Sequence, residues 1–314
     1  MRNDEYLCRS ASEVSKLIIT HHTIHHSKTM ELQQLEHTAT AVRRDIVRMV
    51  NAVNSGHPGG SLGCTDFMVA LYFEVMHLKT DDQGKVVFDM DGQGEDLFFL
   101  SNGHISPVFY SVLARRGYFP VSELATFRKL DSRLQGHPTT AEHLPGIRIA
   151  SGSLGQGLSV ANGAAFAKKL NGDDRHVYVL MGDGEQQEGQ VWEGAMFAPH
   201  HKLGNLTAII DLNGQQIDGP TKLVMNNRDL GAKYEAFGWN VEHMEGNDMA
   251  QVVTKLKEAR QNEDVPTMII MHTEMGFGID YMMGSHKWHG VAPNAEQLVT
   301  ALNQLPLSVG MSDY

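Results

Sequence analysis

The segment GDGEQQEGQVWEGAMFAPHHKLGNLTAIIDLN at positions 182–213 constrains the fold more than any other part of the chain. The apolar run at 176–181 before it is bounded by turn-forming residues, which is typical of a buried strand. Residues 205–211 have the same character and predict a neighbouring strand. Gly182 and Gly184 permit a sharp turn, so Asp183 is expected at the carboxyl end of its strand, where ligands bind in open α/β sheets.

Asn213 lies just past the end of the second strand. Asp183, Asn213 and a loop carbonyl together offer the oxygen ligands that Mg²⁺ prefers, with positions left open for phosphate oxygens. A lone Gly-Asp-Gly is common in surface turns, but the whole segment from strand to Asn213 is specific. The sequence therefore predicts a site for a cation and a diphosphate.

Strands and helices alternate through the rest of the chain. Ala41, Ile46, Val47 and Val50 follow helical spacing, and a turn cluster at 54–60 is expected to end that helix. The further predicted elements are a helix at 65–76, a strand at 96–100, two short helices, a polar loop at 131–153, a helix after residue 157, a helix at 229–237, a strand at 239–243, a helix at 248–261, a strand at 267–272 and a loop ending at Gly290. This order predicts an α/β fold with a mostly parallel sheet covered by helices on both faces.

One domain is the better interpretation, because no internal repeat or low-complexity linker interrupts the pattern. The predicted division is a flexible N-terminal extension at 1–30, a single domain at 31–305 and a C-terminal tail at 306–314. The extension contains the pairs His21-His22 and His25-His26. Metal capture by this quartet is one interpretation; a flexible arm, or sequence upstream of a natural start at Met30, is the favoured one.

Charge and cysteine content exclude several classes of protein. The chain has 314 residues and a formal net charge of −11, which argues against nucleic acid or an anionic membrane as the main partner. No apolar run approaches the length of a membrane span. Cys8 and Cys64 are too few for a disulfide framework and suit a reducing, cytoplasmic environment.

Histidines occupy four glycine-flanked loops. His57, His104, His137 and His289 each follow or precede a glycine or proline turn. Any one of them is more typical of an ordinary turn than of a catalyst, but four together suit a substrate with several hydroxyl groups, because imidazole both donates and accepts protons near neutral pH. The glycines at 152–157 allow close approach of a flat ligand or another chain, and packing alone also explains them.

The ordered motifs resemble the N-terminal, pyrophosphate-binding part of transketolase, a thiamine diphosphate enzyme. The resemblance runs from about residue 40 to residue 290. It rests on SGHPGGSLG at 55–63, LSNGH at 100–104, GHP at 136–138, GSLGQGLS at 152–159, GDGEQQEG at 182–189, DLNGQQIDG at 211–219 and HKWHG at 286–290. It implies a thiamine diphosphate-binding fold, with thiamine diphosphate and Mg²⁺ as cofactors.

Residue roles follow from the same resemblance. The implied metal ligands are Asp183, Asn213 and the carbonyl of Gln215. The implied cofactor contacts are His104, Gly152, Ser153, Leu154, Asp183, Gly184, Asn213 and His289. His57, His104, His137 and His289 are similar to the histidines that line the path to the reacting carbon. Glu188 is similar to a carboxylate near the subunit interface that communicates with an activating glutamate, and His286 is a candidate substrate neighbour only.

The implied reaction is transfer of a two-carbon ketol unit from a ketose phosphate to an aldose phosphate, as in the pentose phosphate pathway (EC 2.2.1.1). In the family, a pyrimidine-binding domain contributes the activating glutamate and a C-terminal domain follows. This sequence stops at Tyr314, so the resemblance implies a split transketolase whose C-terminal partner subunit completes a heterotetramer. The alternatives are an alpha-type subunit of a 2-oxo acid dehydrogenase, a more distant 1-deoxyxylulose-phosphate synthase, and a non-catalytic or truncated chain that only binds the cofactor.

Overall fold

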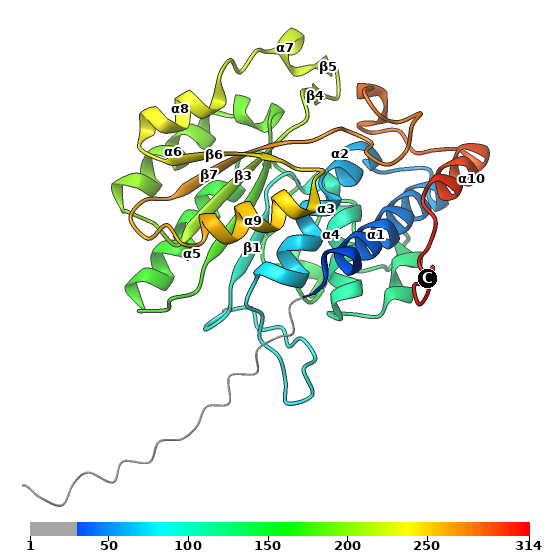
Figure 1. Cartoon of the computed structure of the whole chain (residues 1–314), viewed down its shortest axis with the longest axis horizontal. Coiled ribbons are helices and arrows are strands. Elements are labelled where there is room, and N and C mark those ends of the chain that lie inside the picture. The colour runs from blue at the N-terminus through cyan, green and yellow to red at the C-terminus, as the bar shows by residue number, and fades with distance from the viewer. Residues whose placement is uncertain (1–29) are drawn as a thin grey trace, which may run out of the picture.

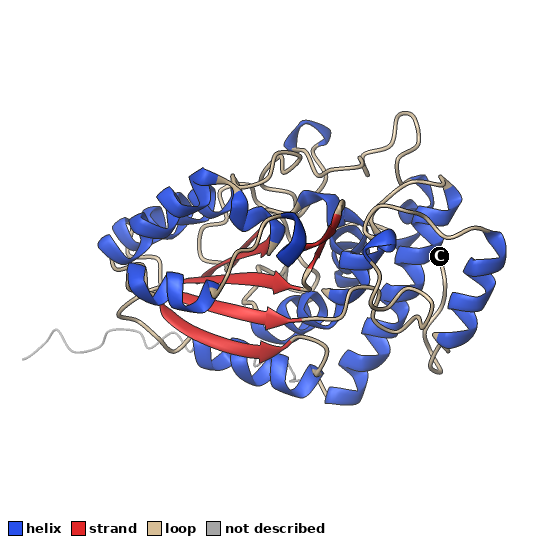
Figure 2. Ribbon diagram, turned by 90° about the horizontal axis from the view of Figure 1, so that it is seen from above, coloured by secondary structure: helices blue, strands red, loops and turns tan. Residues whose placement is uncertain are grey.

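Five parallel strands form the central sheet of the computed structural model, which describes residues 30–314. The strands are β1 (Leu97–Leu100), β2 (Val177–Gly182), β3 (Leu206–Leu212), β6 (Asn240–Glu245) and β7 (Thr267–His272). Their order across the sheet is β1-β2-β3-β7-β6, and every neighbouring pair is parallel. Figure 2 shows the strands running side by side with helices above and below them.

Both faces of β1, β2, β3 and β7 are buried, which explains why these strands are mostly apolar runs, whereas the edge strand β6 is only partly buried. In β2, Tyr178 and Leu180 face one core, while Val179 and Met181 face the other. The first core contains α1 (Leu32–Ala52), α3 (Thr65–Ala70), α4 (Ser106–Arg116) and α9 (Met249–Ala259), and the second contains α5 (Gly157–Leu170), α6 (Gly189–His200) and α8 (Leu230–Phe237) (Figure 1). The predicted fold class is confirmed.

The order of the strands reverses between β3 and β7. The chain passes from β1 through β2 to β3 in one direction, and the later strands β7 and β6 lie on the far side of β3. Ligands of open α/β sheets bind in the crevice outside the carboxyl ends of the strands at such a point. The loops that follow β1, β2 and β3 carry the SNGH, Gly-Asp-Gly and Asn213 motifs to this edge.

The turn cluster predicted at 54–60 is only partly a turn. The first helix ends at Ala52, but a short helix, α2 (Pro58–Gly63), already begins inside the cluster. Proline fits the first turn of a helix, where its missing N–H group has no partner to lose. Gly59 permits close packing, because a Cβ atom there would lie 2.6 Å from Cγ of Met275.

Several elements were missed from the sequence. They are α6 itself, the small hairpin of β4 (Gln215–Gln216) and β5 (Gly219–Pro220), the helix α7 (Thr221–Val224) and the helix α10 (Ala295–Gln304). A signal for α10 was present, since Asn294 and Gln297 form a capping box at its first turn. The predicted helix at 65–76 is α3 followed by a π-helical turn, Leu71–Val75.

The segment after residue 305 packs along α1. Asp313 pairs with Arg44 at 2.8 Å, and Arg48 donates a 2.8 Å hydrogen bond to the carbonyl of Tyr314. The predicted domain boundaries stay predictions. The N-terminal extension, with Cys8 and the pairs His21-His22 and His25-His26, lies outside the described residues. Within residues 30–314, no helix is both long enough and apolar enough to span a membrane.

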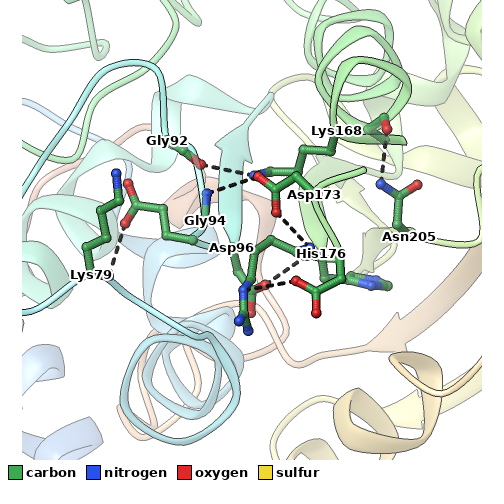
Figure 3. A network of polar contacts seen from close by, with 12 residues as sticks. Lys79, Gly92, Gly94, Asp96, Lys168, Asp173, His176 and Asn205 are labelled. Carbon is green, nitrogen blue, oxygen red and sulfur yellow. Dashed lines mark hydrogen bonds and ion pairs between the residues drawn. The ribbon is translucent and has the colours of Figure 1, made fainter. Parts of the chain in front are cut away.

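Polar side chains form a network at the amino-terminal ends of the strands, opposite the Gly-Asp-Gly turn (Figure 3). The carboxylate of Asp96 accepts hydrogen bonds from the backbone N–H of His176 and from Arg260. The imidazole of His176 shares a 2.8 Å hydrogen bond with the hydroxyl of Thr207, and its side chain is buried. Burial lowers the pKa of His176 to about 4.

This burial predicts that acid weakens the fold through His176. Its ordinary pKa is 6.5 and its folded pKa is about 4, so the unfolded chain binds the extra proton between these values. The stability that the neutral His176 contributes is fully present above pH 6.5 and is lost as the pH falls toward 4. In this range the free energy of unfolding decreases by up to about 1.4 kcal/mol per pH unit. In urea unfolding between pH 7 and pH 5, His176→Gln should lose less stability than the parent. The exposed His200→Gln should follow the parent, and equal slopes for all three chains would contradict the prediction.

Candidate active site

A cavity of about 470 Å³ lies at the carboxyl edge of the sheet. Its walls come from the loops that follow β1, β2 and β3 and from three segments far from them in the sequence. The lining residues are His57, His104, His137, Gly152, Leu154, Gly182, Gly184, Glu185, Gln187, Glu188, Gln215, Gln216, Ile217 and His289. The cavity therefore brings together most of the site residues that were predicted from the sequence.

The four predicted histidines form one cluster. The ring centroid of His57 lies 5.1 Å from that of His104, 6.4 Å from that of His137 and 5.6 Å from that of His289. His104 and His289 are 5.0 Å apart. Because four separate segments contribute these rings, their convergence is a property of the tertiary fold.

The pKa of each of the four imidazoles is lowered, which favours the neutral form. Burial, together with the neighbouring His289, Arg128 and His137, lowers the pKa of His57 to about 4. Burial also lowers the pKa of His104, His137 and His289. The Nδ1 atoms of His57 and His289 are buried and have no hydrogen-bond partner in residues 30–314. Neutral rings with free nitrogens can accept or donate a proton at a ligand hydroxyl group.

Asp183 is buried and lies between Gly182 and Gly184, which both line the cavity. Its Oδ1 accepts a 2.7 Å hydrogen bond from the N–H of Gly184, and its Oδ2 accepts one of 2.8 Å from the N–H of Gly214. Thr221 donates a third, of 3.2 Å, to Oδ2. These bonds tie the turn after β2 to the loop after β3, so the carboxylate stays at the point where both strands end.

The carboxylate of Asp183 is costly to bury in its charged form. Burial, together with the nearby carboxylate of Asp211, raises its pKa to about 7. Neither group has a lysine or arginine among the described neighbours that shift its pKa. A divalent cation would offset this cost, so the donor chemistry fits the Mg²⁺ site that the sequence predicts. The site differs from a histidine or cysteine centre, and residues 30–314 place no group of three His, Cys, Asp or Glu residues around a common metal position.

The two other predicted metal ligands adjoin Asp183. The amide of Asn213 donates from Nδ2 to Asp211 at 2.7 Å, which fixes its orientation, and its Oδ1 accepts a 2.9 Å bond from the N–H of Gln215. Gln215 lines the cavity, and its Oε1 is buried without a partner in the described part of the chain. The three predicted ligands therefore lie just past the ends of the neighbouring strands β2 and β3. Asp211, which orients Asn213, was missed from the sequence.

Glu185 is a second residue that sequence reasoning missed. Its side chain is 2 % exposed. Oε1 accepts hydrogen bonds from the hydroxyl of Ser101 and from the N–H of Gly155 at 2.7 Å, while Oε2 accepts from the N–H of Gly182 at 3.0 Å. One carboxylate thus ties the ends of β1 and β2 to the glycine-rich loop. Its place between two glycine turns in GDGEQQEG was the available signal.

Loss of this carboxylate should destabilise the domain. Glu185→Ala would leave two buried N–H groups and one hydroxyl without their acceptor, each costing about 1–3 kcal/mol. Glu185→Gln keeps one acceptor oxygen and should cost less. Urea unfolding at pH 7 measures both effects, with the exposed Glu193→Ala as the control. If Glu185→Ala unfolded at the same urea concentration as the control, the bracing role would be wrong.

The remaining predicted residues lie at the rim. Gly152 leaves space for a ligand, since a Cβ atom there would meet only His137, at 3.7 Å. Leu154 lines the cavity, whereas Ser153 is exposed outside the lining. Glu188 is exposed at the start of α6. His286 lines an adjacent hollow of about 480 Å³ with Lys287 and Trp288.

Comparison with known proteins gives a consistent picture. Residues 35–309 match the family described as transketolase, thiamine diphosphate binding domain. The chain is similar to one of the subunits of apulose-4-phosphate transketolase from Phocaeicola vulgatus, at 37% identity over 276 residues, which is 88% of this chain and 95% of that protein. It is also similar to the 6-deoxy-6-sulfo-D-fructose transketolase subunit SqwG of a Clostridium species, at 34% identity over 271 residues, covering 86% and 96% of the two chains.

Solved structures agree with these matches. The crystal structure of transketolase from Campylobacter jejuni superposes with a TM-score of 0.80 at 31% identity. The alignment covers 91% of this chain but only 44% of that one. This chain therefore spans less than half of that transketolase chain, while it spans nearly all of the two relatives that are named as subunits.

Proposed function

Because this chain belongs to the transketolase family, as a transketolase-type N-terminal subunit with a thiamine diphosphate-binding domain, we propose that it catalyses two-carbon ketol transfer together with a C-terminal partner subunit. The donor is a ketose and the acceptor an aldose, each carrying an anionic group such as phosphate. One observation carries this proposal: His57, His104, His137 and His289 converge beside the buried Asp183.

The proposed roles of the residues follow from the family resemblance. Asp183, Asn213 and the carbonyl of Gln215 would hold Mg²⁺, whose charge would offset that of the diphosphate in a chain of net charge −11. His104 and Gly184 would lie beside the diphosphate and Gly152 and Leu154 beside the aminopyrimidine, with the exposed Ser153 as a further cofactor contact. Bound thiamine diphosphate would supply the carbanion and the electron sink. The contribution of this chain is orientation, charge and proton transfer.

The histidine cluster would transfer protons to and from the hydroxyl groups of the substrate. Neutral imidazoles with free Nδ1 atoms at His57 and His289 can accept a proton from a sugar hydroxyl and return it to the second sugar. The cluster presents several such nitrogens within one cavity, which matches a polyhydroxylated substrate. Glu188, exposed at the rim, is suited to contact the partner subunit.

The proposed assembly contains two copies of each chain, so that the partner supplies the pyrimidine-binding and C-terminal domains. The names of the similar subunits concern a phosphorylated apulose and a sulfonated fructose, so the substrate of this chain need not belong to the pentose phosphate pathway. These names support an anionic sugar as the class of substrate.

A substrate panel tests the proposal. The co-purified complex, with Mg²⁺ and thiamine diphosphate, would be offered ketose phosphates and a sulfonated ketose as donors, each with an aldose phosphate as acceptor. We expect a two-carbon transfer product from at least one pair. Decarboxylation of 2-oxo acids would identify another two-chain thiamine diphosphate enzyme. Cofactor binding with no turnover of any donor would identify a non-catalytic subunit.

A further inference from the structure

Arg128 occupies an unusual position behind the histidine cluster. It lies in the left-handed region of backbone conformation, with a φ of 56°, which non-glycine residues adopt rarely. Its N–H donates a 2.9 Å hydrogen bond to the carbonyl of Leu134, which closes the loop between the two residues. Such a conformation persists only where the surroundings fix it, and functional sites are a common setting.

The guanidinium group of Arg128 connects two histidine-bearing turns. Nη1 donates a 3.1 Å hydrogen bond to the hydroxyl of Ser55, two residues before His57. Nη2 donates a longer one, of 3.4 Å, to the carbonyl of Gly136, the residue before His137. The guanidinium also lies close against Gly136, because a Cβ atom at that residue would come within 2.7 Å of Cζ of Arg128.

The helix that follows His104 holds the same turn from its other side. Ser106, at the start of α4, donates a 2.8 Å hydrogen bond to the carbonyl of Gly136, and Tyr110 donates one of 2.9 Å to the carbonyl of Gln135. The segments that carry His57, His104 and His137 are therefore joined through one carbonyl group and one arginine. Removing Arg128 would leave the turn before His57 without this connection.

Arg128 also places a permanent positive charge near these rings. The other groups that face His57 and His137 or line the cavity with them are His104, His289, Glu185 and Glu188. Glu185 is occupied by three hydrogen bonds and Glu188 is exposed at the rim. The charge of Arg128 lowers the pKa of both His57 and His137, in addition to burial.

We propose that Arg128 is a positioning residue, which joins the turns of His57 and His137 and places a fixed positive charge near both imidazoles. Only the use of this role in catalysis rests on the proposed function. Arg128 does not line the cavity and is not one of the proposed cofactor contacts, so it acts through the two histidines. Its removal should change how these rings titrate even when no substrate, cofactor or partner is present.

Histidine titration by NMR of the full chain tests the role directly, with His57→Gln and His137→Gln to assign the signals. Arg128→Met removes the charge and the hydrogen bonds, and the pKa of His57 and His137 should rise by about half a unit or more. Arg128→Lys keeps the charge and should leave the pKa values near those of the parent. Arg133→Met is the matched control, because Arg133 lies in the same loop but pairs with Glu123 at 2.8 Å.

Unchanged titration of His57 and His137 in Arg128→Met, or an equal shift in Arg133→Met, would overturn the proposal. Should Arg128→Met fail to fold, Arg128→Gln removes the charge and retains a hydrogen-bond donor, and the same shift is expected. In the assembled complex, the acid limb of the kcat/KM profile should move to higher pH in the uncharged variants. A titration shift in a complex without ketol transfer would refute the proposed function alone, whereas ketol transfer with unmoved titration would refute the role of Arg128 alone.

Discussion

Asp183→Ala is expected to weaken metal-dependent binding of thiamine diphosphate by at least about 100-fold, or about 2.8 kcal/mol. Asp183 is the only carboxylate among the proposed metal ligands, and it lies where the loops after β2 and β3 meet. Without it, the amide of Asn213 and the carbonyl of Gln215 would have to hold the cation as neutral ligands. Calorimetry of the assembled complex, with and without Mg²⁺, measures the effect.

The variant should remain folded. Removing the carboxylate leaves the N–H groups of Gly184 and Gly214 and the hydroxyl of Thr221 without an acceptor, but it also removes a charge that is costly to bury. Asp183→Asn retains an acceptor without the charge, so it should fold well and still bind the metal poorly. Asp174→Ala, exposed near the opposite edge of the sheet, is the matched control. Unchanged cofactor affinity in folded Asp183→Ala would refute the metal assignment.

The purified chain alone should have no ketol-transfer activity, and adding the partner subunit should raise the rate by at least about 10²-fold, the lower range for a positioned acid or base. The physical reason is that both carboxylates lining the cavity already have other roles in this chain. Glu185 already accepts three hydrogen bonds, and Glu188 is exposed at the rim. Because we propose that Glu188 contacts the partner subunit, we expect that subunit to supply the carboxylate that activates the aminopyrimidine.

Enzyme assays of the two purified chains, first separately and then mixed, all with Mg²⁺ and thiamine diphosphate, test this expectation. Glu188→Gln in the mixed complex is a useful addition, because it should lower activity without changing the stability of the isolated chain. Robust turnover by the purified chain alone would falsify the split-enzyme proposal. Size-exclusion chromatography with light scattering would show in the same samples whether the mixture forms the expected complex of two copies of each chain.

Much of the fold could be predicted from local patterns. The strands β2, β3 and β7 were recognisable because both faces of the sheet are buried, which makes each strand a continuous apolar run. Helix α6 was missed, because the Gly-Asp-Gly and Asn213 motifs at its two sides dominate that segment. The start of α2 at Pro58 was misread as part of a turn, since proline and glycine occur both in turns and at helix ends.

For the candidate site, the sequence by itself determined which residue types follow each strand, and the order of its motifs determined the family. Only the tertiary structure decided that His57, His104, His137 and His289 share one cavity, in which each ring centroid lies 5.0–6.4 Å from that of at least one other histidine. It also decided that Glu185 is buried as a brace while Glu188 is exposed at the rim of the cavity, although both belong to one motif. Local patterns record what a residue can do, whereas burial and contact depend on segments that lie far apart in the chain and meet only when the sheet has formed.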